Sequence, residues 1–380
     1  MRSYILCRVV LGRLHHLNLY ISVGLWEMAQ KRTLDAFFTV VPKRRKENEP
    51  DQDAQAGHSA HPAYPFPIAN LPALMVRDVA SLPARPGRRI NDQPDLDLLY
   101  FEPYIPAYLG KQMFDFLRSE LPFYRVEYDI KRGGHQTHIV TPRYFTYPLA
   151  LKHDIIYWAM SNVHTNCVME SCSNADRWTT VFGLDDTSYF DAGGAVTDKL
   201  STMKANDKRY DRYPPRPIPQ CLDALRKSTE AATNCKFNFC LVNYYASGAD
   251  SISFHSDDER FLGAEPAIAS FSLGARRDFL MKHKPPGPGE SAAATEARGV
   301  KLALGSGDMV LMRGATQSNW LHSVPKRTGK NQDDGGRINI TFRRAMVKDG
   351  TENYYNYNVG RGPVYRWDKT SRQMVLWERG

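Results

Sequence analysis

The run 337–343 shows a clear alternation of polar and hydrophobic residues. Successive side chains of a β-strand point to opposite faces of its sheet, so Ile338, Ile340 and Phe342 are predicted to face a core. The opposite face would carry four polar side chains, which come from Arg337, Asn339, Thr341 and Arg343. Such a face is either exposed to solvent or directed into a polar cavity.

Short segments that are rich in β-branched and aromatic residues, and separated by turn residues, predict further strands. These strands lie at 237–245, 267–273, 277–283, 307–313 and 337–346. The spacing of Phe114, Leu117 and Leu121 before Pro122 predicts one helix, and 214–235 is predicted to hold a loop and a second helix. The pattern favours a mainly β fold of the α+β class, with a two-sheet jelly-roll core and flanking helices.

Four parts are predicted along the chain, at 1–27, 28–95, 96–370 and 371–380. The second part is charged and proline-rich and lacks folding periodicity, so it is predicted to be a disordered tail. The third part would be a single β-rich domain, and the last a short carboxyl-terminal tail.

Residues 1–27 have two interpretations. They contain three arginines and no acidic residue before Glu27, which is typical of a mitochondrial presequence. Alternatively, the protein begins at Met28 and the preceding residues are an extension of the gene model. We favour the second interpretation because a short docking motif follows Met28 almost immediately.

Candidate metal ligands occur at His255, Asp257 and His322. His255 and Asp257 are two residues apart, so both would point to the same side of a strand or its end. His322 would come from another strand folded back against them. Two imidazoles and one carboxylate suit a mononuclear non-haem Fe(II) site that keeps open positions, unlike a closed structural zinc site. A histidine and an aspartate at this spacing also occur by chance on exposed strands.

Candidate cosubstrate ligands strengthen the metal prediction. Arg337 and Arg343 share one strand face, and two guanidinium groups suit the two carboxylates of 2-oxoglutarate. Asn243 and Tyr245 also share a face and would donate hydrogen bonds to the same acid.

The combined motifs resemble those of the AlkB-type nucleic-acid dealkylases. The matching residues are Asn243 and Tyr245, His255 and Asp257, His322, the segment Ala269–Phe279 and the run RINITFR at 337–343. Similarity extends from about Leu98 to about Trp367, and the series His-x-Asp-Asp-Glu resembles the eukaryotic branch that repairs duplex DNA. The resemblance implies a double-stranded β-helix with a substrate lid of hairpins, within 123–143.

The resemblance also implies cofactors and a reaction. Fe(II) would be bound by His255, Asp257 and His322, with 2-oxoglutarate and O2 as cosubstrates. Asn339 and Thr341 would join the cosubstrate site. Oxidative decarboxylation would give succinate, and hydroxylation of a methyl group on 1-methyladenine or 3-methylcytosine would release formaldehyde.

Four further residues are predicted to contact the substrate. Asp258 would accept a hydrogen bond from the exocyclic amine of the damaged base, with Glu259 beside it, and Arg143 would face a phosphate. Phe182 would stack on an extruded base. The alternatives are a solvated carboxylate for Asp258 and a core residue for Phe182.

Composition agrees with a polyanionic partner. The 380 residues carry a formal net charge of +9, which favours DNA, or RNA, as a substrate. The six cysteines show no CxxC pairing, and reduced intracellular thiols are expected. No apolar stretch reaches the ~18 residues that a bilayer-spanning helix needs, so no membrane partner is expected.

A docking motif is predicted in the tail, formed by Lys31, Leu34, Phe37 and Phe38. Its apolar residues share one side of a helical turn and resemble the motif by which repair proteins bind the sliding clamp. Lys31 occupies the usual glutamine position, and a short core strand is the alternative. The basic cluster Lys43–Lys46 resembles a nuclear localisation signal, although a solvated charge run has the same composition. A nuclear protein is therefore expected, with the mitochondrion as the alternative through 1–27.

Residues 144–176 interrupt the similarity between Arg143 and Arg177. They contain no glycine and match no motif, so we interpret them as a translated intron or a lineage-specific insertion.

The sequence therefore predicts an oxidative DNA dealkylase. An RNA demethylase of the same family would keep every iron and cosubstrate residue. A protein hydroxylase is disfavoured by the RINITFR run and the positive charge, and a non-catalytic clamp-binding scaffold by the complete ligand set.

Overall fold

The structure is a computed structural model of the chain. It describes residues 57–125, 127–132, 135–140, 178–205, 214–285, 297–327, 335–347 and 362–378. The two segments at 127–132 and 135–140 are described by their backbone alone. The motif at 31–38, Arg143 and the segment 144–176 lie outside the described residues.

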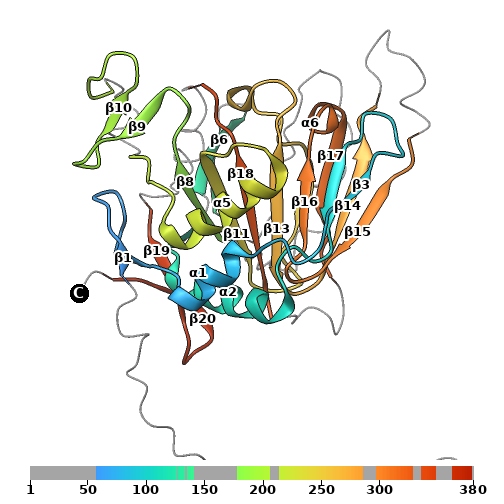
Figure 1. Cartoon of the computed structure of the whole chain (residues 1–380). Coiled ribbons are helices and arrows are strands. Elements are labelled where there is room, and N and C mark those ends of the chain that lie inside the picture. Colours follow the sequence, from blue (N-terminus) through green and yellow to red (C-terminus); the bar gives the residue numbers. More distant parts are fainter. Residues whose placement is uncertain are drawn as a thin grey trace, which may run out of the picture. The chain divides into compact units, whose positions relative to one another are not determined.

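Two antiparallel sheets dominate the described chain (Figure 1). The larger sheet has ten strands, in the order β20 (Gln373–Leu376), β19 (Val364–Asp368), β5 (Phe123–Arg125), β8 (Trp178–Gly183), β11 (Phe239–Tyr245), β18 (Arg337–Arg343), β13 (Ile268–Gly274), β16 (Met309–Met312), β4 (Leu98–Phe101) and β3 (Arg88–Ile90). The smaller sheet has four, in the order β12 (Ile252–His255), β17 (Trp320–Val324), β14 (Arg277–His283) and β15 (Val300–Leu304). The jelly-roll prediction is confirmed.

Three separate hairpins extend from this core. They pair β1 (His58–Ser59) with β2 (Ile68–Ala69), β6 (Glu127–Arg132) with β7 (His135–Val140), and β9 (Ser188–Phe190) with β10 (Val196–Asp198). The pair β6 and β7 lies within the segment that the sequence predicts as a hairpin region. Its part as a substrate lid stays a prediction.

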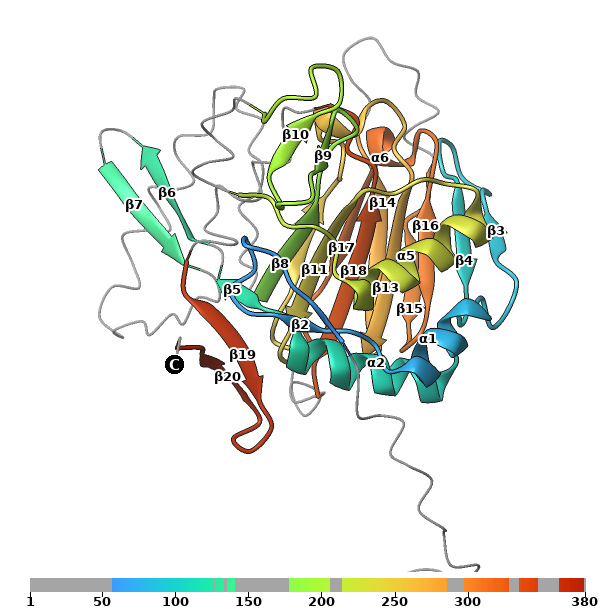
Figure 2. The ribbon, with the colours of Figure 1, turned by 60° about the vertical axis from the view of Figure 1, so that its left-hand side comes forward.

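Helices cover one face of the ten-stranded sheet, as Figure 2 shows for α1 (Ala73–Ala80), α2 (Ala107–Glu120) and α5 (Gln220–Thr233). Helix α2 buries Met113, Phe114 and Leu117, which confirms the predicted helix there. Helix α5 confirms the one predicted within 214–235. Two short elements, η2 (Arg260–Leu262) and α6 (Thr316–Asn319), lie in the connections next to the smaller sheet.

Strand β18 separates two hydrophobic layers. Ile338, Ile340 and Phe342 are fully buried in the cluster that also contains residues of α2 and α5. The second cluster lies between the two sheets and includes Leu241 and Phe279. Because alternate side chains of a strand point to opposite faces, the polar residues of β18 face the space between the sheets. The alternation predicted from the sequence is therefore confirmed.

The disorder predicted for 28–95 is wrong for residues 57–95. Helix α1 buries Met75 and Val79, the Tyr64 hydroxyl donates to the Pro217 carbonyl over 2.7 Å, and the backbone amide of Leu71 donates to Gln220 over 2.7 Å. Tertiary packing on α5 therefore stabilises a segment whose local sequence is rich in proline. The local sequence pattern underestimates the order of such segments, because most of the stability of a helix in a protein comes from tertiary packing.

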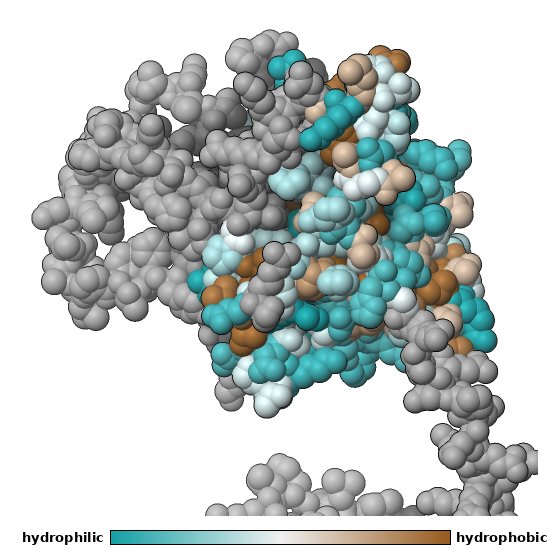
Figure 3. All heavy atoms as spheres, turned by 90° about the vertical axis from the view of Figure 1, so that its left-hand side faces the viewer, coloured by the Kyte–Doolittle hydropathy of each residue, from teal (hydrophilic) through white to brown (hydrophobic). Residues whose placement is uncertain are grey.

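Hydrophilic residues make up most of the described surface on the face drawn in Figure 3, where hydrophobic residues form small scattered groups. Among the described residues, no helix has the length and apolar character needed to span a bilayer.

Candidate active site

Two paired strands bring the predicted histidines together. His255 is the last residue of β12, and it lies directly opposite His322 of β17 in the antiparallel register. The two imidazole centroids are 4.3 Å apart. Asp257 follows two residues after β12 and is buried, with 6% of its surface exposed. The predicted arrangement, in which His322 comes from a strand folded back against the other two ligands, is confirmed.

The three side chains present their ligand atoms to one point. Asp257 Oδ1 lies 4.0 Å from His255 Nε2, and Asp257 Oδ2 lies 3.7 Å from His322 Nε2. These separations are too long for hydrogen bonds, and all three ligand atoms lie within 4.8 Å of one another. The Nδ1 atom of His255 donates to the carbonyl of Ser253 over 2.8 Å, so in the neutral ring the Nε2 atom carries the lone pair. Two imidazole nitrogens and one carboxylate are the donor set that non-haem Fe(II) takes, so the residues fit that ion.

Electrostatics keeps the candidate ligands in their metal-binding forms. Burial by itself would raise the pKa of Asp257, but Arg343 and then His322 and His255 outweigh it, and the pKa of this carboxyl falls below its ordinary value. Burial, followed by the neighbouring His255, lowers the pKa of His322 to about 3. Near neutral pH the site therefore holds an ionised carboxylate and a neutral imidazole at His322.

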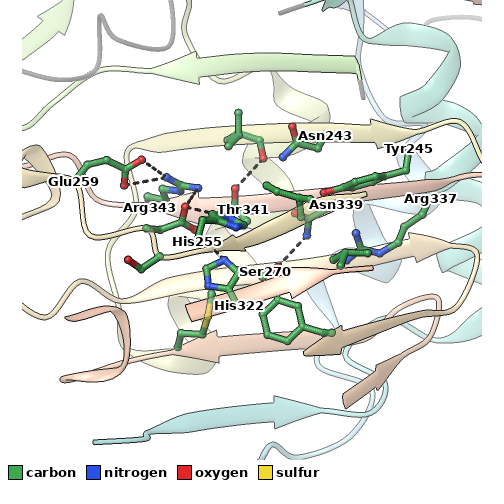
Figure 4. Close-up of a pocket in the computed structure, with 17 residues that line it drawn as sticks. Asn243, Tyr245, His255, Glu259, Ser270, His322, Arg337, Asn339, Thr341 and Arg343 are labelled. Atoms are coloured by element: carbon green, nitrogen blue, oxygen red, sulfur yellow. Dashed lines mark hydrogen bonds and ion pairs between the residues drawn. The ribbon is translucent and has the colours of Figure 1, made fainter. Parts of the chain in front are cut away.

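A cavity of about 190 Å³ opens beside these residues, between the two sheets. Figure 4 shows Arg343 near the candidate ligands and Arg337 toward the other end of the cavity. Its polar lining comes from Asn243, Tyr245, His255, Ser256, Asp257, Glu259, Ser270, His322, Arg337, Asn339, Thr341 and Arg343. Its apolar lining comes from Leu241, Ile252, Phe279, Met312 and Val324. The structure thus brings every predicted metal and cosubstrate residue into one cavity.

The two arginines of β18 have different surroundings. Arg343 Nη2 lies 3.0 Å from Asp257 Oδ1, and Arg343 Nη1 lies 3.4 Å from Glu259. Arg337 donates to the Ser272 hydroxyl over 2.8 Å, and its guanidinium carbon lies 5.4 Å from the centroid of the Tyr245 ring. Arg343 is therefore paired with a candidate metal ligand, whereas Arg337 contacts Ser272 and the aromatic ring of Tyr245.

The remaining polar residues of the cavity are held by neighbouring strands. Thr179 of β8 donates to Asn243 over 2.9 Å. Asn339 donates to Ser270 and to the carbonyl of Phe271, and the hydroxyl of Thr341 donates to the carbonyl of Leu241. These bonds fix the shape of the polar wall.

Phe182 does not face the cavity, so its predicted stacking on a base is wrong. It pairs with Cys240 in the register of β8 and β11, on the face directed toward the helices. The ring is fully buried, and it lies 6.1 Å from the ring of Tyr64. The position opposite Asn243 is Thr179, which donates a hydrogen bond to the Asn243 side chain.

The other predicted substrate residues separate in space. Glu259 lines the cavity. The side chain of Asp258 is half-exposed and forms an ion pair of 2.7 Å with Lys284, outside the cavity lining. A direct contact between Asp258 and a base held in this cavity is therefore not supported.

Gln317 is a residue that the sequence analysis missed. It lies in α6, is 1% exposed, and its side-chain oxygen accepts a hydrogen bond of 2.9 Å from the backbone amide of Asp257. Its position five residues before His322 was the one available signal. Phe279 and Met312 were missed as cavity residues because hydrophobic strand residues give no sign of which layer they face.

Comparison with known proteins agrees with this geometry. The model of the 2OG-Fe(II) oxygenase superfamily matches residues 167–343. This stretch contains the three candidate metal ligands and the whole of β18.

The chain is also similar to AlkB-type proteins. It is 42% identical over 137 residues to "Alpha-ketoglutarate-dependent dioxygenase alkB homolog 3" of Mus musculus, which covers 35% of this chain and 46% of the relative. It is 34% identical over 174 residues to "DNA oxidative demethylase ALKBH2" of Arabidopsis thaliana, covering 42% of this chain and 53% of the relative. With the Homo sapiens protein of the latter name it shares 38% identity over 171 residues, covering 45% of this chain and 59% of the relative.

These similarities agree with the resemblance stated from the motifs: the matched part of the chain is similar to AlkB-type dioxygenases. The chain spans about half the length of the curated relatives it matches. Relatives of both names match, so the branch that the sequence suggested stays a prediction.

Proposed function

We propose that the protein is an Fe(II)- and 2-oxoglutarate-dependent dioxygenase that removes alkyl groups oxidatively from the bases of DNA. Lesions such as 1-methyladenine and 3-methylcytosine are the proposed substrates. One observation carries the proposal: the His255, Asp257 and His322 ligand set opens into the same cavity as the polar face of β18. The names of the matched relatives support DNA as the substrate.

The three ligand side chains would hold the iron on one face and leave its other positions open. When bound, iron and 2-oxoglutarate would supply the oxidation of the alkyl carbon by O2, with succinate and carbon dioxide as the coproducts. The protein's contribution is to bind and orient these groups.

Arg337 is proposed to bind the carboxylate of 2-oxoglutarate that lies farther from the iron. Arg337 is 1% exposed and its guanidinium lies beside the Tyr245 ring, and a planar guanidinium pairs with a carboxylate through two parallel hydrogen bonds. Tyr245 and Asn243 would donate to the same cosubstrate. Arg343 is proposed to hold Asp257 in place, because it already donates to that carboxylate over 3.0 Å.

The apolar wall would limit water at the reacting carbon. Phe279 and Met312 face the cavity from the smaller and the larger sheet. The ring of Phe279 lies 5.3 Å from that of His322. A dry wall beside the ligands strengthens the charge interactions on which the site depends.

The decisive experiment measures succinate formation by the full chain with methylated single-stranded DNA, duplex DNA and RNA side by side. The proposal requires turnover on a DNA substrate with release of formaldehyde. Turnover on RNA alone would assign the protein to the other polymer. No turnover on any of the three would favour a non-catalytic scaffold and overturn the proposal.

We further propose a nuclear location and docking to a sliding clamp through Lys31, Leu34, Phe37 and Phe38. The support is the sequence motif together with the DNA-directed names of the relatives. These residues lie outside the described part of the chain, so a binding measurement with the peptide 28–46 is the direct test.

A further inference from the structure

The short helix α6 connects two segments that carry candidate metal ligands. It precedes β17 directly, so Gln317 lies only five residues before His322 in the chain. The same helix contacts the segment that contains Asp257. The contact between α6 and the Asp257 segment therefore links the two ligands.

Two hydrogen bonds from one loop hold α6. The hydroxyl of Thr316 accepts a hydrogen bond of 2.9 Å from the backbone amide of Asp97. The indole of Trp320, the residue after the helix, donates to the carbonyl of Pro94 over 2.9 Å. Helix α6 is thus tied to the loop before β4 independently of the metal ligands.

Gln317 extends from this fixed helix to the aspartate. Its side-chain oxygen accepts the amide proton of Asp257, and its side-chain nitrogen lies 3.1 Å from the sulfur of Met312. Since Gln317 is 1% exposed, its side chain has little room for another conformation. The bond fixes the backbone of Asp257, and it leaves both carboxylate oxygens available to a metal ion and to Arg343.

Lys284 forms a second link between the same two segments. Its ammonium group donates to Asp258 over 2.7 Å and to the backbone carbonyl of Gln317 over 3.3 Å. Its backbone amide donates to the carbonyl of Asn319, at the end of α6. The predicted substrate residue Asp258 thus takes part in holding the loop next to the metal ligand.

We propose that Gln317 is a positioning residue for the iron site, and that the ion pair of Lys284 with Asp258 supports it. Together they hold Asp257 at the correct distance from His322. This inference rests on the iron site of the proposed function. It assigns to the Gln317 side chain the task of setting the position of Asp257, since bonds to metal ligands from outside the coordination sphere orient those ligands.

The test is the affinity of the full chain for Mn(II), measured by electron paramagnetic resonance without cosubstrate or nucleic acid. Gln317→Met keeps the size of the side chain and removes the acceptor, so Mn(II) binding should weaken by about 10- to 100-fold. Gln317→Glu keeps an oxygen that can accept the Asp257 amide proton, and binding should return to within about threefold of the unmodified protein.

Thr316→Val is the matched control. It alters the neighbouring residue of the same helix, which is equally buried, and it removes the bond to Asp97 without touching Asp257. Its melting temperature should fall while Mn(II) affinity stays within about twofold, because a general weakening of α6 is not the proposed cause.

If Gln317→Met does not fold, Lys284→Met and Asp258→Asn test the same inference, because they change the more exposed ion pair that supports the loop. Each should weaken Mn(II) binding by about two- to fivefold. The double variant should bind Mn(II) as well as the single variant with the lower affinity, because both changes break the same ion pair. Unchanged affinity in these variants, or in a folded Gln317→Met, overturns the inference. Failure of the unmodified protein to bind Mn(II) would instead overturn the proposed function.

Discussion

Arg337→Lys separates the proposed roles of the two arginines on β18. A lysine keeps the positive charge, but it cannot form two parallel hydrogen bonds to a carboxylate. One charge-assisted hydrogen bond is worth about 1.5–3 kcal/mol. Because Arg337 is 1% exposed, water cannot replace the lost bond. The KM for 2-oxoglutarate should therefore rise by about 10- to 150-fold, at about 1.4 kcal/mol for each factor of ten.

The assay is succinate formation over a range of 2-oxoglutarate concentrations at saturating iron, together with Mn(II) affinity. Arg337→Lys should leave Mn(II) affinity within about twofold, because Arg337 lies away from the ligands. Arg343→Lys is the comparison: its guanidinium lies 3.0 Å from Asp257, so its main defect should be in metal binding. A normal KM in Arg337→Lys, or a loss of Mn(II) affinity in it, would refute the assignment of this arginine to the cosubstrate.

Four further predictions concern residues or segments in separate parts of the chain. Asp257→Ala should abolish 2-oxoglutarate turnover, because it removes one of three ligands, and retention of more than a small fraction of activity would mean that the ligand set is misassigned. Phe182→Ala should lower the free energy of unfolding by about 3–5 kcal/mol in urea denaturation, with activity per folded molecule unchanged; lost activity at full stability would restore its stacking role. Replacing Phe37 and Phe38 by alanine should weaken clamp binding in titration calorimetry by more than about tenfold without altering dealkylation of a free oligonucleotide, and damaged catalysis would contradict docking. Deleting 144–176 should leave solubility and activity intact or improve them, and an unfolded deletion protein would show that the segment is integral.

The metal ligands and the polar strand were predictable because their signals are local. A histidine and an aspartate two apart share a side, and the alternation at 337–343 fixes which residues of β18 lie together. The strands predicted at 237–245 and 267–273 appear as β11 and β13, the two neighbours of β18. Spacing along the chain was therefore enough to predict those parts of the site that come from a single strand or turn.

The other parts depend on pairing between distant segments. Phe182 and Thr179 lie on opposite faces of β8, and only the register with β11 decides which of them shares the face of Asn243. Asp258 turns to Lys284 because β14 ends beside it, and no pattern near Asp258 reveals that neighbour. Gln317 was overlooked for the same reason, since its partner is sixty residues away.

Strand β18 links the integrity of the fold to the chemistry of the cavity. All seven of its residues are buried, and it is paired on both sides, with β11 and with β13. Shifting its pairing by one residue would turn its isoleucines into the cavity and its arginines into the hydrophobic layer beneath the helices. The cost of burying two guanidinium groups there excludes the shifted form. The arginines that line the cavity therefore also disfavour the misfolded register. Replacing them with apolar residues would remove the energetic penalty that keeps this strand in register.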